Sequence, residues 1–248
     1  MLHYFNQKFL APKAFYKTSS KLLPWCILAF SITFIYGMIA GLFIAPADYQ
    51  QGDGFRIIYV HVPSAFTAMF AYLVMAMAGV VTLVFRVKIA AICMSVSARI
   101  GVWFTLLALV TGSIWGKPMW GTWWIWDARL TSVLILFFLY LGFIALQSVI
   151  TDQNSRDRAS SILAIVGAIN LPVIHYSVVW WNTLHQGATL AKFAVPSIAP
   201  AMLYPLLAMI AAFFLFYAVM LMTRMRSQIL LREMNSQWVK EEVRYEFS

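Results

Sequence analysis

Residues 115–132 of the chain read WGKPMWGTWWIWDARLTS, and they hold five of its ten tryptophans between two long apolar segments. If this stretch is helical, four side chains share one face because they are spaced i, i+3, i+4 and i+7. These four are Trp120, Trp123, Trp124 and Asp127. The spacing alone leaves two interpretations open. One is an aromatic belt where a membrane meets water; the other is a docking platform for a large, flat aromatic ligand.

The composition around this stretch indicates a membrane protein. Of the 248 residues, 62% are hydrophobic and 11% are charged, with a mean hydropathy of +0.78. Soluble domains carry roughly 25% charged residues, so lipid is the expected solvent for most of this chain. The net charge of +9 comes from basic residues in short clusters between apolar runs. That distribution indicates membrane topology, not nucleic-acid binding.

Six apolar runs predict an all-α integral membrane protein with six transmembrane helices. The predicted spans are residues 22–45, 57–85, 95–115, 130–150, 162–181 and 201–223. The first run is too long for the apolar region of a signal peptide. We therefore expect one membrane domain over residues 1–223, with residues 115–132 as an external segment between the third and fourth helices. Residues 224–248 are expected to form a cytoplasmic tail.

The basic residues predict the orientation, because six spans place both termini on one side of the membrane. With the termini inside, the inner segments hold fourteen of the eighteen basic residues: Lys8, Lys13, Lys17, Lys21, Arg86, Lys88, Arg99, Arg156, Arg158, Arg224, Arg226, Arg232, Lys240 and Arg244. The outer segments hold the other four: Arg56, Lys117, Arg129 and Lys192. The positive-inside rule therefore predicts cytoplasmic termini. Cys26 and Cys93 then lie near cytoplasmic ends, where free thiols are expected.

This orientation brings His61, His185 and the tryptophan-rich stretch to the same external face. A lone histidine in a membrane protein is more often a packed, hydrogen-bonded residue than a ligand, and we assign His3 and His175 no ligand role. His175 precedes His185 by ten residues, which is roughly 15 Å along a helix. These two cannot bind one metal ion unless the chain folds back between them.

His61 and His185 can hold a metal ion between two neutral imidazoles. A zinc site needs a third or fourth protein ligand, which leaves Asp48, Asp53 or Asp127 as a disfavoured alternative. An iron porphyrin needs only the two axial ligands.

A porphyrin also requires aromatic walls and cations for its propionates. Trp120, Trp123 and Trp124 can supply the walls. The external cations are the candidates for the propionates, namely Arg56, Lys117, Arg129 and Lys192. For Arg129, pairing with Asp127 or with a lipid headgroup is an equally good interpretation.

Catalysis is the weakest prediction for this chain. Residues 112–118, GSIWGKP, superficially resemble a phosphate-binding loop, but they have one residue too few between the glycines and a proline in place of Ser or Thr. The chain is therefore expected to hydrolyse no ATP by that route, and no nucleophile stands beside a base. A b-type electron-transfer cytochrome and a solute transporter remain rival classes.

Residues 120–131, WGTWWIWDARLT, resemble the tryptophan-rich "WWD" signature of haem-handling membrane proteins, with one external histidine before it and another after it. The chain length and the six predicted spans resemble the haem exporter protein C family of bacterial cytochrome c maturation. The resemblance covers essentially the whole chain.

The resemblance implies a protein of the bacterial inner membrane that binds haem b without a covalent bond at the periplasmic face. Such a protein delivers haem to a membrane-anchored periplasmic haem chaperone for the biogenesis of c-type cytochromes. Its implied partners form an ABC-type complex: an ATP-binding subunit, a second membrane subunit and a small single-span subunit. It implies His61 and His185 as axial iron ligands. The other implied haem-contacting residues are Trp115, Trp120, Trp123, Trp124, Trp126, Asp127 and Arg129, with Arg56 as a further candidate.

Overall fold

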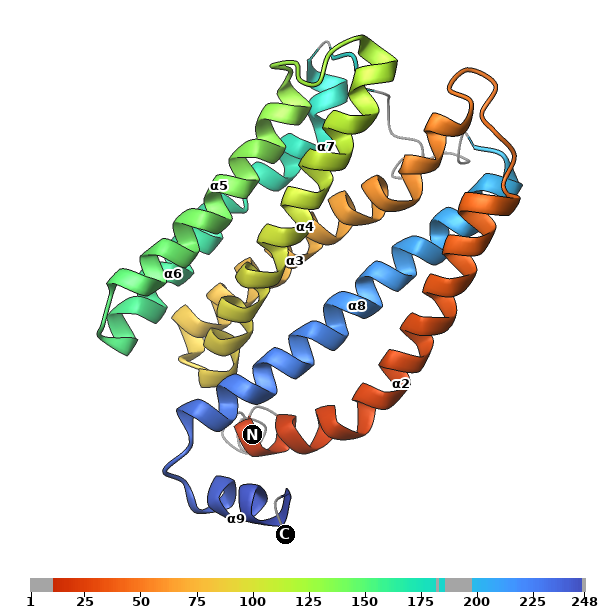
Figure 1. Cartoon of the computed structure of the whole chain (residues 1–248). Helices are drawn as coiled ribbons and strands as arrows, with labels where there is room; N and C mark the ends of the chain where they lie inside the picture. The colour runs from red at the N-terminus through yellow and green to blue at the C-terminus, as the bar shows by residue number, and fades with distance from the viewer. Residues whose placement is uncertain (1–10, 182, 186–197, 247–248) are drawn as a thin grey trace.

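The computed structural model describes residues 11–181, 183–185 and 198–246, and its regular elements are helices (Figure 1). In chain order they are α2 (Pro12–Ile39), a π-helical turn (Ala40–Ile44), a 3-10 turn (Asp53–Ile57), α3 (Ile58–Phe85), α4 (Lys88–Trp120), α5 (Ala128–Val149), α6 (Gln153–Gly167), α7 (Asn170–Trp180), α8 (Pro200–Arg232) and α9 (Gln237–Glu246). The all-helical prediction is confirmed.

Six helical stretches are long and apolar enough to cross a membrane, as predicted from the sequence. They are Pro12–Ile44, Asp53–Phe85, Lys88–Trp120, Ala128–Val149, Gln153–Trp180 and Pro200–Arg232. Several predicted boundaries are wrong by up to ten residues, because hydropathy marks only the part of a helix that requires lipid. The hydrogen-bonded helix continues into polar flanks. The first stretch therefore begins at Pro12 instead of residue 22, and the last ends at Arg232 instead of residue 223.

The polar residues 151–160 are largely helical. Asp152 is the N-cap of α6, and its Oδ2 accepts a hydrogen bond from the Ser155 backbone N–H at 2.8 Å. Hydrogen bonds from the Ser155 backbone and side chain hold the pKa of Asp152 below its ordinary value. The capped polar turn thus lets the fifth membrane crossing start directly after the loop that follows α5.

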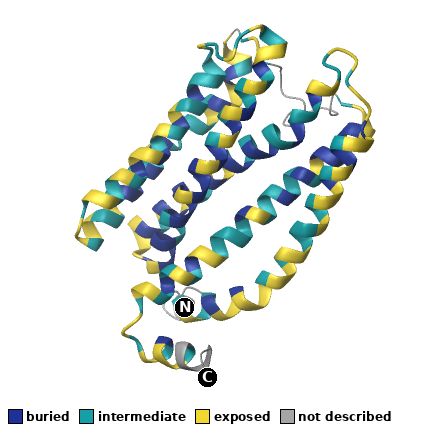
Figure 2. Ribbon diagram, in the orientation of Figure 1, coloured by how far each residue is buried: buried dark blue, intermediate teal, exposed yellow. Residues whose placement is uncertain are grey.

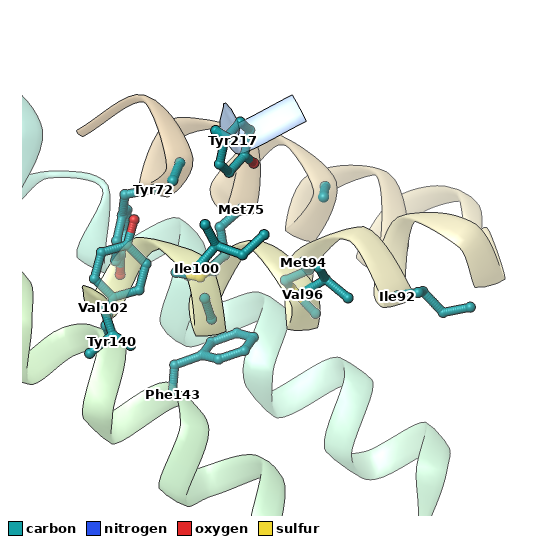
Figure 3. Close-up of a cluster of buried hydrophobic side chains, with 14 of the residues drawn as sticks. Tyr72, Met75, Ile92, Met94, Val96, Ile100, Val102, Tyr140, Phe143 and Tyr217 are labelled. Carbon is teal, nitrogen blue, oxygen red and sulfur yellow. The ribbon is translucent and has the colours of Figure 1, made fainter. Parts of the chain in front are cut away.

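The helices form a central antiparallel pair with one group on each side of it. α3 and α4 pack on each other in the middle, α2 and α8 pack together on one side, and α5, α6 and α7 cover the other side (Figure 1). The buried cluster of Figure 3 lies where these groups meet, and it includes Tyr72, Met75, Tyr140, Phe143 and Tyr217. Exposed residues follow the outward faces of the helices (Figure 2). Many of them are large and apolar, as expected of a multi-pass membrane protein.

Close helix packing in this core depends on glycine. A Cβ atom at Gly101 of α4 would overlap the phenol of Tyr140 on α5, and one at Gly167 of α6 would overlap the hydroxyl of Tyr72 on α3. The Tyr140 hydroxyl donates to the Ala68 carbonyl at 2.8 Å, so it joins α5 to α3 across α4. This packing fixes the middle parts of α3, α4 and α5 relative to one another.

The two ends of the bundle carry different segments of the chain. α2 begins and α9 ends at the same end of the bundle, and the tryptophan-rich residues 115–132 lie at the opposite end (Figure 1). The turn between α2 and α3 also lies at that opposite end. The segments predicted to be external are therefore neighbours at one end of the molecule.

Candidate functional site

Residues from several parts of the chain line one cavity at the tryptophan-rich end of the bundle. They belong to the turn before α3, the first half of α3, the last turns of α4, residues 121–127, the start of α5, α7, residues 183–185 and the start of α8. Six of the residues predicted for the site line this cavity: His61, Trp115, Trp120, Trp124, Arg129 and His185. Its floor is apolar and includes Ala68, Leu136 and Ile174. The fold thus brings together two histidines that are far apart in the sequence.

Thr111 of α4 orients the imidazole of His61. The Thr111 Oγ1 lies 3.1 Å from His61 Nδ1 and donates its own proton to the backbone carbonyl of Leu107 at 2.6 Å. Because a hydroxyl has one proton to donate, it must accept from His61, and Nδ1 therefore carries the hydrogen. The unprotonated Nε2 of His61 then keeps its lone pair for a ligand.

Two further residues of α4 hold His61 in place. Gly112 lets the ring lie against the α4 backbone, since a Cβ atom there would lie 3.0 Å from His61 Cε1. Trp115 packs edge-on against the imidazole, with ring centroids 5.6 Å apart and an interplanar angle of 77°. The Trp115 Nε1 donates to Gln51 Oε1 at 2.8 Å, so Trp115 is itself fixed.

The tryptophan-rich stretch is not one helix. α4 ends at Trp120, Gly121 adopts a positive φ of 75°, and the next helix starts at Ala128. The Lys117 Nζ donates to the Gly121 carbonyl at 2.9 Å and caps the helix end. Trp120, Trp123, Trp124 and Asp127 therefore do not share one helical face, because the helix ends at the first of them. Gly116 accommodates the ring of Trp120 instead, with a hypothetical Cβ at 3.0 Å from Trp120 Cε3.

Asp127 connects the start of α5 to the segment that carries His185. Its Oδ1 accepts from the Leu130 backbone N–H at 2.7 Å and caps α5, while its Oδ2 accepts from the Thr183 hydroxyl. The Thr183 Oγ1 in turn accepts from the His185 backbone N–H at 3.0 Å. The His185 ring lies 6.2 Å from the Trp120 ring. Asp127 does not line the cavity, but it anchors the chain segment that does.

The predicted cations have separate environments. The Arg129 Nε donates to Ser177 Oγ at 2.7 Å and its Nη2 to the His175 carbonyl at 3.3 Å, so its partners lie on α7 and not at Asp127. Arg56 donates to Asp53 Oδ1 at 2.9 Å and to the Gly41 carbonyl at 2.8 Å. Of the described cations, Arg129 lines the cavity. Lys192 lies outside the described residues.

The five tryptophans of the stretch divide into two sets. Trp115, Trp120 and Trp124 line the cavity. Trp123 and Trp126 do not line it and are 57% and 77% exposed. Trp124 is notable because its Nε1 is buried without a hydrogen-bond partner among the described residues. Buried donors are nearly always hydrogen-bonded, so this N–H is available to an acceptor outside the described residues.

Sequence reasoning missed several residues that shape the cavity. His175, which was given no ligand role, lines the cavity together with Gln51 and Gly112. Thr111 and Trp115 stand four residues apart, and this helical spacing is the one signal that could have placed Thr111 beside the site. Thr183 gives no such signal, because its role depends on how residues 127 and 183 meet in space.

Comparison with known proteins places this arrangement in a family. The family model described as "Heme exporter protein C" matches residues 5–240. The chain belongs to the Heme exporter protein C family. Heme exporter protein C of Haemophilus influenzae is 50% identical over 229 residues, which cover 92% of this chain and 93% of the relative. Heme exporter protein C of Escherichia coli K12 is 50% identical over 230 residues, which cover 93% of each chain.

A more distant relative extends the similarity to mitochondria. A ccmC-like mitochondrial protein of Marchantia polymorpha, whose name assigns it to cytochrome c biosynthesis, is 45% identical over 189 residues; these cover 76% of this chain and 80% of the relative. The match to the Heme exporter protein C family includes α2 to α8 and thus every described element that lines the cavity.

Proposed function

We propose that this protein binds haem b non-covalently at the periplasmic face of the bacterial inner membrane, with His61 and His185 as axial ligands of the iron. The observation that carries the proposal is the convergence of these two histidines on one tryptophan-walled cavity. A porphyrin supplies four nitrogen ligands of its own, so two imidazoles complete the coordination of its iron.

The surroundings of the two histidines fit this ligand. Thr111 holds His61 in the tautomer that leaves Nε2 free, and metal-binding histidines usually donate their other ring N–H to such a partner. Trp115 and Trp120 offer aromatic faces beside the two imidazoles, with ring centroids at 5.6 Å and 6.2 Å. The apolar floor of the cavity suits the ring system of the haem.

The polar side of the cavity fits the propionates. Arg129 carries a positive charge there, and Trp124 offers a buried indole N–H without a partner among the described residues. Hydrogen bonds to a carboxylate are stronger than those between neutral groups. We assign the propionates to Trp124 and Arg129, which line the cavity, in preference to Arg56 and Lys117, which do not.

The proposed role in the cell rests on family membership and on the membrane orientation that the basic residues predict. Relatives named Heme exporter protein C suggest that the bound haem is cargo, and the mitochondrial relative's name suggests cytochrome c biosynthesis as its destination. We therefore propose delivery of haem to a periplasmic haem chaperone, within an ABC-type complex whose other subunits bind ATP. This chain itself would act as a non-catalytic haem-binding and transfer subunit.

The test is an optical spectrum of the purified protein titrated with haem. The wild type is expected to give the low-spin spectrum of bis-histidine haem, and both His61→Ala and His185→Ala should lose it. Added imidazole should restore the low-spin spectrum in each single variant, because alanine leaves room for a free ligand. An unchanged spectrum in the double variant would refute the ligand assignment.

A further inference from the structure

A second hollow lies on the outside of the bundle, between α3 and α7. Its walls include Met69, Phe70 and Leu73 of α3, and Leu171, His175 and Tyr176 of α7. We call this hollow the lateral groove. Met69 and His175 also line the haem cavity, so the two hollows share a wall made of these two side chains.

The lateral groove exists because the fifth crossing is broken. α6 ends at Gly167 and α7 begins at Asn170. α6 packs against α3 and α5, whereas α7 packs against α5 and makes little contact with α3. Pro172 lies in the first turn of α7, where its missing N–H has no consequence for the helix. The break therefore leaves a gap beside α3 at the level where the cavity lies on the inner side.

The lateral groove has the chemistry of a surface that faces hydrocarbon. It lies between two stretches that can cross a membrane. Phe70, Leu73 and Tyr176 are 40%, 44% and 43% exposed, and the groove is almost entirely apolar. A flat, largely apolar molecule dissolved in lipid can reach such a groove directly, whereas a ligand dissolved in water has no aqueous path to a surface that faces hydrocarbon.

The shared wall is suited to opening. Met69 has an unbranched, flexible side chain that adapts to different shapes. His175 is exposed, and its ring packs edge-on against Tyr176 with centroids 4.7 Å apart. Its backbone carbonyl accepts from Arg129, which lines the cavity, and the residue itself lines both the groove and the cavity. The wall between the groove and the cavity thus includes one flexible side chain and one exposed side chain.

We propose that the lateral groove admits haem from the lipid bilayer into the cavity, with Met69 and His175 as the gate. This inference rests on the proposed haem-binding function and adds the direction from which haem arrives. It assigns roles to His175 and to the break between α6 and α7 that iron ligation does not require.

The experiment measures the rate at which the bis-histidine spectrum develops after haemin is added to the protein in phosphatidylcholine nanodiscs. Leu73→Trp fills the groove outside the cavity. It is expected to slow the appearance of the spectrum by about tenfold or more, which corresponds to an increase of about 1.4 kcal/mol in the activation free energy of uptake. The final spectrum should equal that of the wild type. Val80→Trp is the matched control, since Val80 is also lipid-exposed on α3 (44%) but lies outside the groove.

A second variant separates blockage from misfolding. Leu73→Cys, in a background where Cys26 and Cys93 are alanine, is purified in detergent and coupled to a bulky maleimide only after it has folded. Coupling should slow haem uptake after reconstitution, and the uncoupled variant should resemble the wild type.

Equal uptake rates for Leu73→Trp, the coupled variant and the wild type would overturn the proposal and favour arrival from water. A wild type that gives no bis-histidine spectrum would instead refute the haem site itself.

Discussion

At the scale of single residues, the site depends on side chains that never touch the iron. Thr111 uses its proton on the Leu107 carbonyl and therefore accepts from His61, and Gly112 leaves the space in which the imidazole lies. Both residues act by fixing which nitrogen of His61 faces the cavity and where it lies. The tautomer is thus a property of α4 and not of His61 alone.

Thr111→Val tests this role, because valine has nearly the same shape and no hydroxyl. We expect the haem affinity to fall by about 10- to 100-fold, the usual effect of removing the residue that hydrogen-bonds a metal-ligating histidine. Thr111→Ser keeps the hydroxyl and should stay close to the wild type. Haem titrations followed in the Soret band measure both affinities, and equal affinities for valine and serine would contradict the assignment.

Trp124→Phe tests the proposed propionate contact, since phenylalanine keeps an aromatic wall and removes the indole N–H. A hydrogen bond to a charged group contributes about 1.5–3 kcal/mol, so the affinity for haem should fall about tenfold or more. The affinity for haem dimethyl ester, which has no carboxylates, should change little. Trp126→Phe is the control, because Trp126 is 77% exposed and does not line the cavity. The same loss for haem and its ester would show that Trp124 acts only by packing.

At the scale of the helices, packing of α4 against α5 positions the α4 residues that hold His61 relative to the start of α5. Gly101 allows this packing, because a side chain there meets the buried Tyr140 phenol. Gly101→Ala should destabilise the protein by about 1–3 kcal/mol, the usual cost of overpacking. For a chain of this size each kcal/mol lowers the melting temperature by about 2–4 °C. Thermal unfolding in detergent measures the shift.

Gly142→Ala provides the matched control on the neighbouring helix. Nothing lies within 4 Å of a Cβ atom at this exposed position of α5. Since alanine favours a helix over glycine by about 1 kcal/mol, this variant should be as stable as the wild type or slightly more stable. A similar loss of stability in both variants would mean that the contact with Tyr140 is not the cause.

The sequence predicts the membrane-crossing helices better than it predicts the breaks within them and the contacts between them. The six crossings were predictable, because each requires about 20 apolar residues. The break between Gly167 and Asn170 was not predicted, because residues 162–181 form one continuous apolar run in which Asn170, Pro172 and His175 gave only a hint of an interruption. Topology placed His61 and His185 on one face. Thr111, Gly112 and Thr183 escaped notice because their roles depend on the register between helices that are distant in the sequence.

At the scale of the whole molecule, the bundle holds its candidate ligands at one end and its basic residues largely at the other. The cavity lies between the central pair α3–α4 and the group α5–α7, and the lateral groove lies on the outer side of the same contact. A single broken helix, α6–α7, thus borders both hollows. Haem binding and haem uptake would be coupled through this helix and not through the α2–α8 pair.

The orientation of the molecule is the last prediction, because every periplasmic role depends on it. The segments predicted to lie inside hold fourteen of the eighteen basic residues. Among the described residues, α2 begins and α9 ends at the end opposite the cavity (Figure 1), and the positive-inside rule directs that end to the cytoplasm. Tyr49 at the opposite end is 89% exposed, and Met234 near the α9 end is 62% exposed. Each is replaced by cysteine in a background without Cys26 and Cys93. A membrane-impermeant maleimide should label Tyr49→Cys in intact spheroplasts and Met234→Cys only after lysis. The reverse pattern would place the cavity on the cytoplasmic side and exclude delivery to a periplasmic chaperone.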